Sequence, residues 1–433
     1  MNLAPGALRK SGSGFELAVA LGLLGAEDEL PAGVLDGVAV LGELGLDGSV
    51  RPVPGTLALV DALARGGVES VIVPLENAGE ASLVPGVHVR AARTLTELRA
   101  CLKGEETWPE WPVEPEADDA PDDEPLDLAD VRGLAFARQA LEVAAAGGHH
   151  LLFVGPPGTG KTMLARRLAT IVPPLEHQEA LEVTRIHSAA GYPTRGRLVR
   201  ARPFRAPHHT ASTPALVGGG SHRPHPGEVT LAHRGVLFLD ELGEFAPTTL
   251  DALRQPIEER VVRISRASMS LSFPAAFQLV ACTNPCPCGI GEPGCRCTEA
   301  QRARYRRRLS APLLDRFDLR MRVTGPEPND QCGESSDDVR ARVVQAVERQ
   351  RSRYADWPWS ANVHVAAGAV NRLIPLSTDA ADAWCDLIQS RVLTGRGAAR
   401  IRRVARTLAD LDDAREVSAA HVDFAASLRS DVP

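Results

Sequence analysis

The stretch 155–162 constrains this chain more than any other. It reads Gly155-Pro156-Pro157-Gly158-Thr159-Gly160-Lys161-Thr162 and fits the pattern G-x-x-x-x-G-K-[ST]. An apolar segment (151–154) precedes it, and a segment with helical periodicity (163–171) follows. In this context the pattern predicts a loop whose backbone N–H groups surround phosphate oxygens, with Lys161 on the β/γ-phosphates and the Thr162 hydroxyl on Mg2+. The alternative is a glycine-rich turn that matches by chance, but Lys161 is one of only 3 lysines beside 45 arginines.

Length and composition narrow the class of protein. A chain of 433 residues is expected to form two or three domains. Its 44% apolar and 24% charged residues are typical of a soluble globular protein. We find neither an apolar run of about 20 residues nor the pattern of a signal peptide, so we expect no membrane span and a cytoplasmic protein. The 8 cysteines, four of them close together, agree with a reducing compartment.

Charge is distributed unevenly. The net charge is −7, but residues 104–125 carry 10 acidic side chains and no basic one, so the rest of the chain sums to −7 + 10 = +3. Residues 185–234 hold 8 arginines, 6 of the 12 histidines and one acid. The proline-rich acidic segment is interpreted as a solvated linker rather than a mimic of DNA. The arginine-rich segment predicts a basic surface.

The periodicity predicts an α/β fold with a parallel sheet and a helical C-terminal region. Residues 1–103 are interpreted as a small α/β unit and 104–125 as the linker. In 126–330 strands alternate with helices, the pattern of a parallel sheet with crossover connections. Apolar residues recur at helical spacing in 331–433, which predicts a helical domain.

Polar residues follow two further apolar strands. Segment 235–239 ends at Asp240 and Glu241, 79 residues after Lys161. Asp240 is suited to hold Mg2+ and Glu241 to polarise the water that attacks the γ-phosphate, although a pair of acids also begins helices as an N-cap. Segment 277–283 ends at Asn284, which is placed to orient that water.

An arginine in segment 312–318 completes the set of candidate catalytic residues. Arg316 lies in a short polar break between apolar residues. An arginine of this kind, supplied to the γ-phosphate of a neighbouring subunit, is an arginine finger. The alternative is a local salt bridge to Asp315 or Asp318.

Together these segments resemble an AAA+ ATPase, and four longer motifs narrow the resemblance. They are RAPHHT (205–210), PGEVTLAH (226–233), NPCPCG (284–289) and RVARTLADL (403–411). With them, nearly the whole chain resembles the ComM/YifB family of magnesium-chelatase-like AAA+ proteins. The resemblance implies a homohexameric ring with ATP between subunits, Arg316 reaching across, Arg396 as the sensor arginine of a helical lid, an insert near 185–230 and a hairpin before Asn284. It departs from the family at Leu134, usually glutamine, and His150, usually asparagine, which leaves the contacts to adenine in doubt.

Arginines mark two candidate DNA-binding segments. Residues 261–273 are predicted to form a hairpin lined by Arg260, Arg263 and Arg266, and in related ring motors such hairpins hold the phosphate backbone. A second run of five arginines lies in 302–308. For both segments the alternative is a solvated surface whose arginines pair with acids.

Four cysteines lie within twelve residues. Cys286, Cys288, Cys295 and Cys297 follow the pattern C-x-C-x6-C-x-C. Four soft ligands around one metal suggest a structural Zn2+ site, and free thiols are the alternative. The remaining cysteines, namely Cys101, Cys282, Cys332 and Cys385, are expected to be buried as small apolar residues.

The N-terminal unit resembles a Lon protease domain at 42–53 and 71–77. A Lon protease needs a serine nucleophile and an activating lysine. Residues 15–17 and 57–59 stand at those places and contain neither, so proteolysis is rejected. The family domain normally begins earlier, so we expect a truncated or miscalled start that leaves a sheet edge unpaired.

We therefore interpret the chain as an ATP-hydrolysing ring motor acting on branched or single-stranded DNA, and the family implies branch migration in recombination and natural transformation. The ATPase subunit of a magnesium chelatase is the first alternative, because the nucleotide motifs fit it equally well. A nucleotide-gated assembly scaffold is the second, and the pair Asp240 and Glu241 argues against it.

Overall fold

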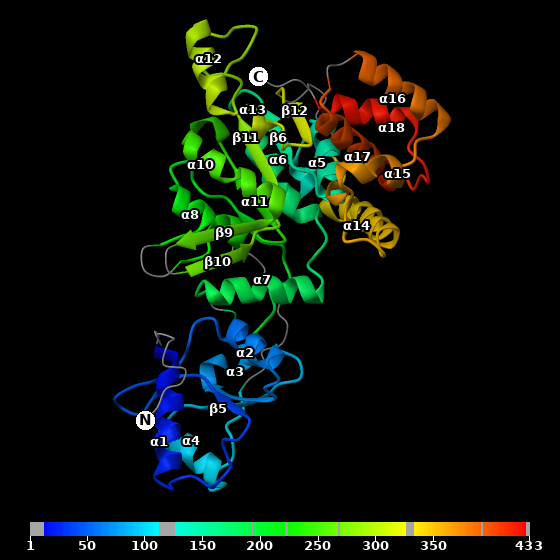
Figure 1. The fold of residues 1–433 in the computed structure, drawn as a ribbon. Coiled ribbons are helices and arrows are strands. Elements are labelled where there is room, and N and C mark those ends of the chain that lie inside the picture. Colours follow the sequence, from blue (N-terminus) through cyan, green and yellow to red (C-terminus); the bar gives the residue numbers. More distant parts are fainter. Residues whose placement is uncertain are drawn as a thin grey trace. The chain divides into compact units, whose positions relative to one another are not determined.

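The structure is a computed structural model that describes residues 13–111, 126–192, 194, 196–220, 224–266, 269–325, 333–390 and 393–429. The chain divides into two compact units. The first comprises Met1–Asp119 and Leu175–Ala201, and the second comprises Ala120–Pro174 and Arg202–Pro433. Each unit is described by itself below (Figure 1). Most of the predicted acidic linker lies outside the described residues.

The first unit is built on a parallel sheet of order β1-β4-β5, with a two-stranded antiparallel pair β2-β3. The strands are β1 (Val38–Val40), β2 (Glu43–Leu44), β3 (Val50–Arg51), β4 (Ser70–Pro74) and β5 (His88–Ala92). The helices are η1 (Ser13–Phe15), α1 (Glu16–Ala26), α2 (Thr56–Arg65), α3 (Leu75–Ala81), α4 (Leu95–Lys103) and α7 (His177–Ala189). Strand β4 is covered on both faces, because Val71 and Val73 pack in one apolar cluster while Ile72 packs in another.

Helix α7 belongs to this first unit although its sequence lies within the predicted nucleotide-binding region. Arg185 of α7 donates to Asp61 of α2 at 2.5 Å. Ser188 of α7 donates to Glu80 of α3, which also accepts from the backbone N–H of Leu57 at 2.9 Å. The predicted boundaries at 103, 125 and 330 stay predictions.

The second unit contains a five-stranded parallel sheet of order β12-β6-β11-β8-β7, which confirms the predicted fold class. Its strands are β6 (Leu151–Val154), β7 (Phe204–Arg205), β8 (Val236–Leu239), β11 (Gln278–Thr283) and β12 (Leu319–Arg322). The residues of β6 point alternately into two clusters, Leu151 and Phe153 into one, Leu152 and Val154 into the other. Both faces of the sheet are therefore buried, which explains why its strands are continuously apolar.

Helices surround this sheet. They are η2 (Leu128–Asp130), α5 (Ala135–Gly147), α6 (Lys161–Ile171), α8 (Thr213–Val217), α9 (Glu228–Leu231), η3 (Leu242–Glu244), α10 (Pro247–Ala252), α11 (Arg254–Glu259), α12 (Glu299–Arg308) and α13 (Ala311–Leu314). The predicted hairpin is present as β9 (Val261–Arg266) paired antiparallel with β10 (Met269–Pro274). In Figure 1 it lies at the opposite end of this unit from α12.

The C-terminal part is helical, as predicted. It comprises α14 (Ser336–Arg353), η4 (Asn362–His364), η5 (Ala367–Ala369), α15 (Val370–Leu373), α16 (Thr378–Ser390), α17 (Gly395–Leu411) and α18 (Ala419–Ser427). Its apolar residues share one cluster with the sheet, since Val343 of α14 and Val404 of α17 pack with Leu151 of β6.

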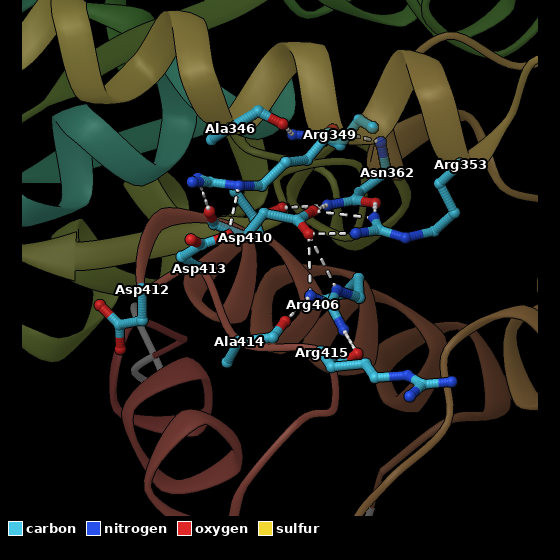
Figure 2. A network of polar contacts seen from close by, with 12 residues as sticks. Ala346, Arg349, Arg353, Asn362, Arg406, Asp410, Asp412, Asp413, Ala414 and Arg415 are labelled. Atoms are coloured by element: carbon cyan, nitrogen blue, oxygen red, sulfur yellow. Dashed lines mark hydrogen bonds and ion pairs between the residues drawn. The ribbon is translucent and has the colours of Figure 1, made fainter.

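A buried carboxylate joins the helices of this region (Figure 2). Asp410 of α17 is fully buried. It accepts from Arg406 at 2.9 and 3.1 Å, from Arg353 of α14 at 3.0 Å and from Asn362 of η4 at 2.8 Å. Arg406 also donates to the backbone carbonyl of Arg415 at 2.8 Å. The motif at 403–411 therefore holds α14, η4 and α17 together.

Candidate nucleotide-binding site

The phosphate-binding loop connects β6 to α6. Gly158 and Gly160 have φ values of 80° and 83°, which favour glycine. Gly155 lies against β12, and a Cβ there would lie 2.2 Å from the carbonyl oxygen of Val323. The chain therefore turns over the end of the sheet and enters α6 with its N–H groups directed at the loop, which suits an anion.

Lys161 is the first residue of α6 and its side chain turns back over the loop. Its Nζ donates to the carbonyl oxygens of Gly155 at 2.8 Å and Pro156 at 2.6 Å. Burial lowers the pKa of this ammonium from its usual value. The ammonium group therefore lies at the loop, where it would contact the phosphate chain of a bound nucleotide.

Two hard oxygen ligands meet beside the loop. Thr162 Oγ1 of α6 donates to Asp240 Oδ2 at 2.8 Å, across 78 residues of sequence. Asp240 directly follows β8, and its Oδ1 accepts from the N–H of Glu241 at 2.9 Å. A hydroxyl and a carboxylate of this kind are the protein ligands that a nucleotide-bound Mg2+ takes, so the arrangement fits that ion.

Glu241 adopts a left-handed backbone conformation, with φ 50° and ψ 48°. A carboxylate beside Asp240 in a strained turn is typical of a residue placed for chemistry. Its Oε2 lies 3.2 Å from Nδ1 of His209, and its side chain is 55% exposed. Half its surface is thus open to a water molecule.

His209 is a site residue that sequence reasoning missed. The arginine- and histidine-rich segment 185–234 predicts only a basic surface. His209 follows β7, the strand next to β8, so the carboxyl ends of two parallel strands bring it to Glu241. Its ring also contacts that of His208 in a tilted arrangement, with centroids 4.1 Å apart. The sequence carried no clear signal for this contact, because β7 is only Phe204–Arg205 and is not an apolar run.

Asn284 follows the last residue of β11, the strand between β6 and β8. The register pairs Thr283 with Val154, the residue before the loop. Asn284 therefore lies at the same edge of the sheet as the loop and Asp240. This is the place from which a side chain can orient a water between them.

Arg316 and Arg396 share a partner that the sequence did not indicate. Arg316 Nη2 lies 2.7 Å from Oε1 of Glu258 in α11, and Arg396 Nη1 lies 3.6 Å from the same oxygen. The sequence alternative for Arg316 was a salt bridge to Asp315 or Asp318, and the observed carboxylate is neither. Arg316 is largely buried, whereas the Arg396 side chain is 69% exposed at the start of α17.

A cavity of about 720 Å³ lies between the first half of α5, the end of β12 and the residues that follow β12. Its apolar lining includes Leu134, Phe136 and Met321. Leu134 also approaches the phosphate-binding loop, with its Cδ1 3.6 Å from where a Cβ on Gly160 would lie. The lining also includes the charged residues Arg138, Glu142, Arg322 and Glu334, so the cavity is mixed in polarity, and its lining side chains come from outside the phosphate-binding loop.

His150, the second departure from the family pattern, does not line this cavity. Its Nδ1 accepts from the N–H of Leu279 at 3.0 Å. Burial lowers its pKa to about 4, while nearby Asp318 opposes that shift. His150 therefore holds β6 to β11 as a neutral ring.

The four clustered cysteines come together in the loop between β11 and α12. Their Sγ atoms all lie within 4.8 Å of one another. Backbone N–H groups of Arg296 and Ile290 lower the pKa of the Cys288 thiol to about 6, so one thiol of the group ionises readily. Cys101 and Cys282 are buried as expected, Cys385 is exposed, contrary to expectation, and Cys332 lies outside the described residues. Cys385 is exposed because it lies on the outer face of α16.

The arginines predicted to contact DNA are partly engaged with acids. Arg263 of β9 pairs with Glu259 and keeps 58% of its side chain exposed. Arg260 ends α11 with φ 57° and is exposed, and the side chain of Arg266 lies outside the described residues. Three arginines of α12 form ion pairs with glutamates. Arg302 pairs with Glu292 and Glu299, Arg306 with Glu299 and Arg308 with Glu244. The alternative of a solvated, acid-paired face thus describes much of α12.

Comparison with known proteins identifies the family. The chain is 42% identical over 436 residues to the uncharacterized protein YifB of Salmonella typhimurium, covering 99% of this chain and 84% of that protein. It is 40% identical over 439 residues to the competence protein ComM of Haemophilus influenzae, covering 99% and 85%. The chain belongs to the ComM/YifB family. The predicted resemblance is confirmed.

Three family models match separate parts of this ComM/YifB chain. "Magnesium chelatase, subunit ChlI" matches 127–331, its C-terminal model matches 333–429 and "Subunit ChlI of Mg-chelatase" matches 1–77. A weaker similarity, 28% identity over 187 residues, relates the chain to Lon protease 2 of Bacillus subtilis, covering 38% of this chain and 33% of that protein. A magnesium-chelatase-like AAA+ protein uses a nucleotide and Mg2+, in agreement with the site. The individual site residues stay predictions.

Among the helices of the described residues, none is both long and apolar enough to cross a lipid bilayer.

Proposed function

We propose that this chain is a cytoplasmic ATPase that couples hydrolysis of ATP to movement along DNA, as a homohexameric ring. The observation that carries the ATPase proposal is the contact between Thr162 and Asp240, with Glu241 next in sequence and half exposed. These residues offer Mg2+ two oxygen ligands and offer a water molecule a base at one edge of the sheet.

The residues divide the reaction among them. Lys161 and the N–H groups of the loop bind the β- and γ-phosphates, and Thr162 and Asp240 hold the Mg2+. Asn284 orients a water molecule, and Glu241 accepts a proton from that water. The oxygen of the water attacks the γ-phosphorus while the bond between the γ-phosphorus and ADP breaks. Charge on the transferred phosphoryl group is met by Lys161 and by an arginine from outside.

The arginine from outside is Arg316 of the neighbouring subunit. In support, Arg316 and Arg396 share Glu258 as a partner and therefore lie together. A phosphate of the adjacent subunit would replace Glu258 as their counter-ion. Two arginines delivered together to one nucleotide make the ring, rather than the monomer, the active species.

Movement along DNA is supported by the hairpin β9–β10, which carries Arg263 with more than half its side chain exposed. Contacts of arginine with phosphates are independent of sequence, which suits a translocating motor. One relative is named a competence protein. We accordingly propose branched or single-stranded DNA as the substrate, and branch migration during recombination as the process.

The second candidate is the ATPase subunit of a magnesium chelatase. It is favoured by the names of the matching family models. The cysteine cluster argues for the DNA motor, because a chelatase ATPase subunit has no need of it.

Steady-state ATPase assays of the full chain test the proposal. Glu241→Gln should retain binding of ATP and lose at least ~100-fold in turnover, the usual contribution of a general base. Glu244→Gln is the matched control, because Glu244 lies three residues later and pairs with Arg308 at the surface. Equal turnover in wild type and Glu241→Gln would refute the catalytic assignment.

The DNA part is tested by adding branched or single-stranded DNA at several salt concentrations. We expect stimulation of turnover that weakens as salt increases. No stimulation at any salt concentration, together with binding to purified chelatase subunits, would reject the motor and support the second candidate.

A further inference from the structure

The loop between β11 and α12 brings four sulfur atoms to one point. The distances are 3.3 Å from Cys286 Sγ to Cys288 Sγ, 3.9 Å from Cys288 Sγ to Cys295 Sγ and 3.6 Å from Cys295 Sγ to Cys286 Sγ. The N–H of Cys288 donates to Sγ of Cys297 at 3.3 Å. Four thiolates at about 2.3 Å from a tetrahedral zinc are about 3.8 Å apart, close to these separations.

The chemistry of the group is that of a closed metal site. All four are free thiols, not disulfides. Soft sulfur ligands favour zinc over Mg2+, and four protein ligands leave no open position for a substrate. A loop of turns and prolines has few apolar contacts of its own, and a metal would hold it in one conformation.

The first half of this loop, up to Gly289, contacts the nucleotide site. Asn284, the residue proposed to orient water, stands two residues before Cys286, with only Pro285 between them. Gly289, between Cys288 and Cys295, lies on the phosphate-binding loop. A Cβ built on it would be 2.9 Å from Cδ of Pro157, closer than real side chains approach.

The second half of the loop reaches the site through α12. Cys297 precedes Thr298, the N-cap of α12, whose Oγ1 accepts from the N–H of Gln301 at 3.3 Å. Tyr305 of α12 places its hydroxyl 3.1 Å from Oγ1 of Thr283, the residue before Asn284. The same hydroxyl lies against Gly243, two residues after Glu241, where a Cβ would be only 2.4 Å away.

We propose that Cys286, Cys288, Cys295 and Cys297 bind one structural Zn2+, and that the zinc-held loop positions the three nucleotide-binding segments at Pro157, Asn284 and Gly243. The metal itself is independent of the proposed function, whereas its effect on ATP rests on that function. The loop acts as a brace outside the site: its residues set where the phosphate-binding loop and Asn284 stand, and none of them reacts.

Metal analysis of the purified full chain tests the site. We expect one zinc per chain in the wild type, and loss of that zinc in Cys288→Ser/Cys295→Ser. Cys385→Ser is the matched control, because that thiol is exposed in α16 and outside the cluster. Equal zinc in the double variant and the wild type, iron in place of zinc, or a wild type without metal after growth with added zinc would overturn the site.

Binding of a fluorescent ATP analogue, without DNA, tests the brace. Gly289→Ala keeps all four cysteines and pushes against Pro157, so we expect zinc to be retained and ATP affinity to fall about tenfold, as overpacking predicts. Gly294→Ala is its control: it lies in the same loop, also at positive φ, but a Cβ there meets only Ile290, at 3.5 Å.

The two tests separate the proposals. Zinc retained with unchanged ATP affinity in Gly289→Ala, or an equal fall in Gly294→Ala, would overturn the brace. Loss of zinc in the double cysteine variant with unchanged ATP affinity would overturn it as well. A wild type that holds zinc and binds no ATP would reject the proposed ATPase and leave the metal site standing.

Discussion

Substitution of Asp410 by asparagine removes the central charge of the buried network in Figure 2. Asp410 is 0% exposed, and Arg406, its partner at 2.9 Å, is 2% exposed. The substitution leaves Arg406 with a full charge and no carboxylate in the protein interior. Breaking a buried ion pair on one side costs about 3–5 kcal/mol, because the remaining charge stays desolvated.

The loss should lie at the lower end of that range. Arg353, the second cationic partner, keeps 26% of its side chain exposed and can turn toward water. Arg406 also keeps its bond to the carbonyl of Arg415. We therefore expect Asp410→Asn to lower the free energy of unfolding by about 3 kcal/mol.

Urea denaturation followed by circular dichroism measures this loss. With an m value of about 2 kcal/mol/M, the transition of the C-terminal region should move down by about 1.5 M. Asp412→Asn is the control, since Asp412 is 70% exposed and pairs with His421 at the surface. It should cost less than about 1 kcal/mol.

A double-mutant cycle excludes a general effect of the substitution. Arg406→Met should cost less in the Asp410→Asn protein than in the wild type, because it then removes an unpaired buried charge. Equal midpoints for Asp410→Asn and Asp412→Asn, or additive effects in the cycle, would refute the reasoning.

Three further predictions concern charge. Burial lowers the pKa of His150 from 6.5 to about 4, so between these pH values the folded state binds fewer protons than the unfolded state. The contribution of His150 to stability is therefore full above about pH 6.5, and up to about 3 kcal/mol of it is lost as the pH drops through 4. His150→Asn should reduce this dependence of the unfolding free energy on pH, measured by urea titrations at stepped pH. Arg263→Ala should weaken DNA binding and reduce the slope of log K against log salt by about 1. Glu259→Gln, which frees Arg263 from its acidic partner, should strengthen DNA binding, and unchanged salt slopes would reject the hairpin as the DNA contact. His209→Ala should raise DNA-independent ATP turnover by up to about fivefold, because it frees the Glu241 carboxylate from an exposed contact of about 1 kcal/mol with the imidazole. A lower rate would instead make His209 a residue that supports Glu241.

Much of the nucleotide site could be predicted because its parts are local. A buried strand, a glycine-rich turn and a helix start are encoded within 151–171, and the acids after β8 follow a strand of the same kind. Parallel strands end at one edge, so recognising three strands was enough to expect the loop, Asp240 and Asn284 together. The sheet order of the structure agrees with that expectation.

The partners of these residues could not be predicted, because they come from distant segments without a spacing rule. Glu258 contacts Arg316 and Arg396 from 58 and 138 residues away. The motif 403–411 was one of four that indicated the family, but its sequence could not say that Asp410 is the buried centre of a network. The predicted burial of Cys385 was wrong for the same reason, because composition gives only the average burial of a thiol and packing decides each case.

By itself, the sequence determined the α/β class and the family, and it predicted the phosphate-binding loop and the acids beside it, since each depends on residues within one strand-loop-helix unit. Only the tertiary structure decided which side chains these units meet. It placed His209 on Glu241, Gly289 on Pro157 and Glu258 between two arginines. The physical reason is that backbone hydrogen bonds and apolar periodicity are short-range signals, whereas a contact between distant side chains exists only after the sheet has packed.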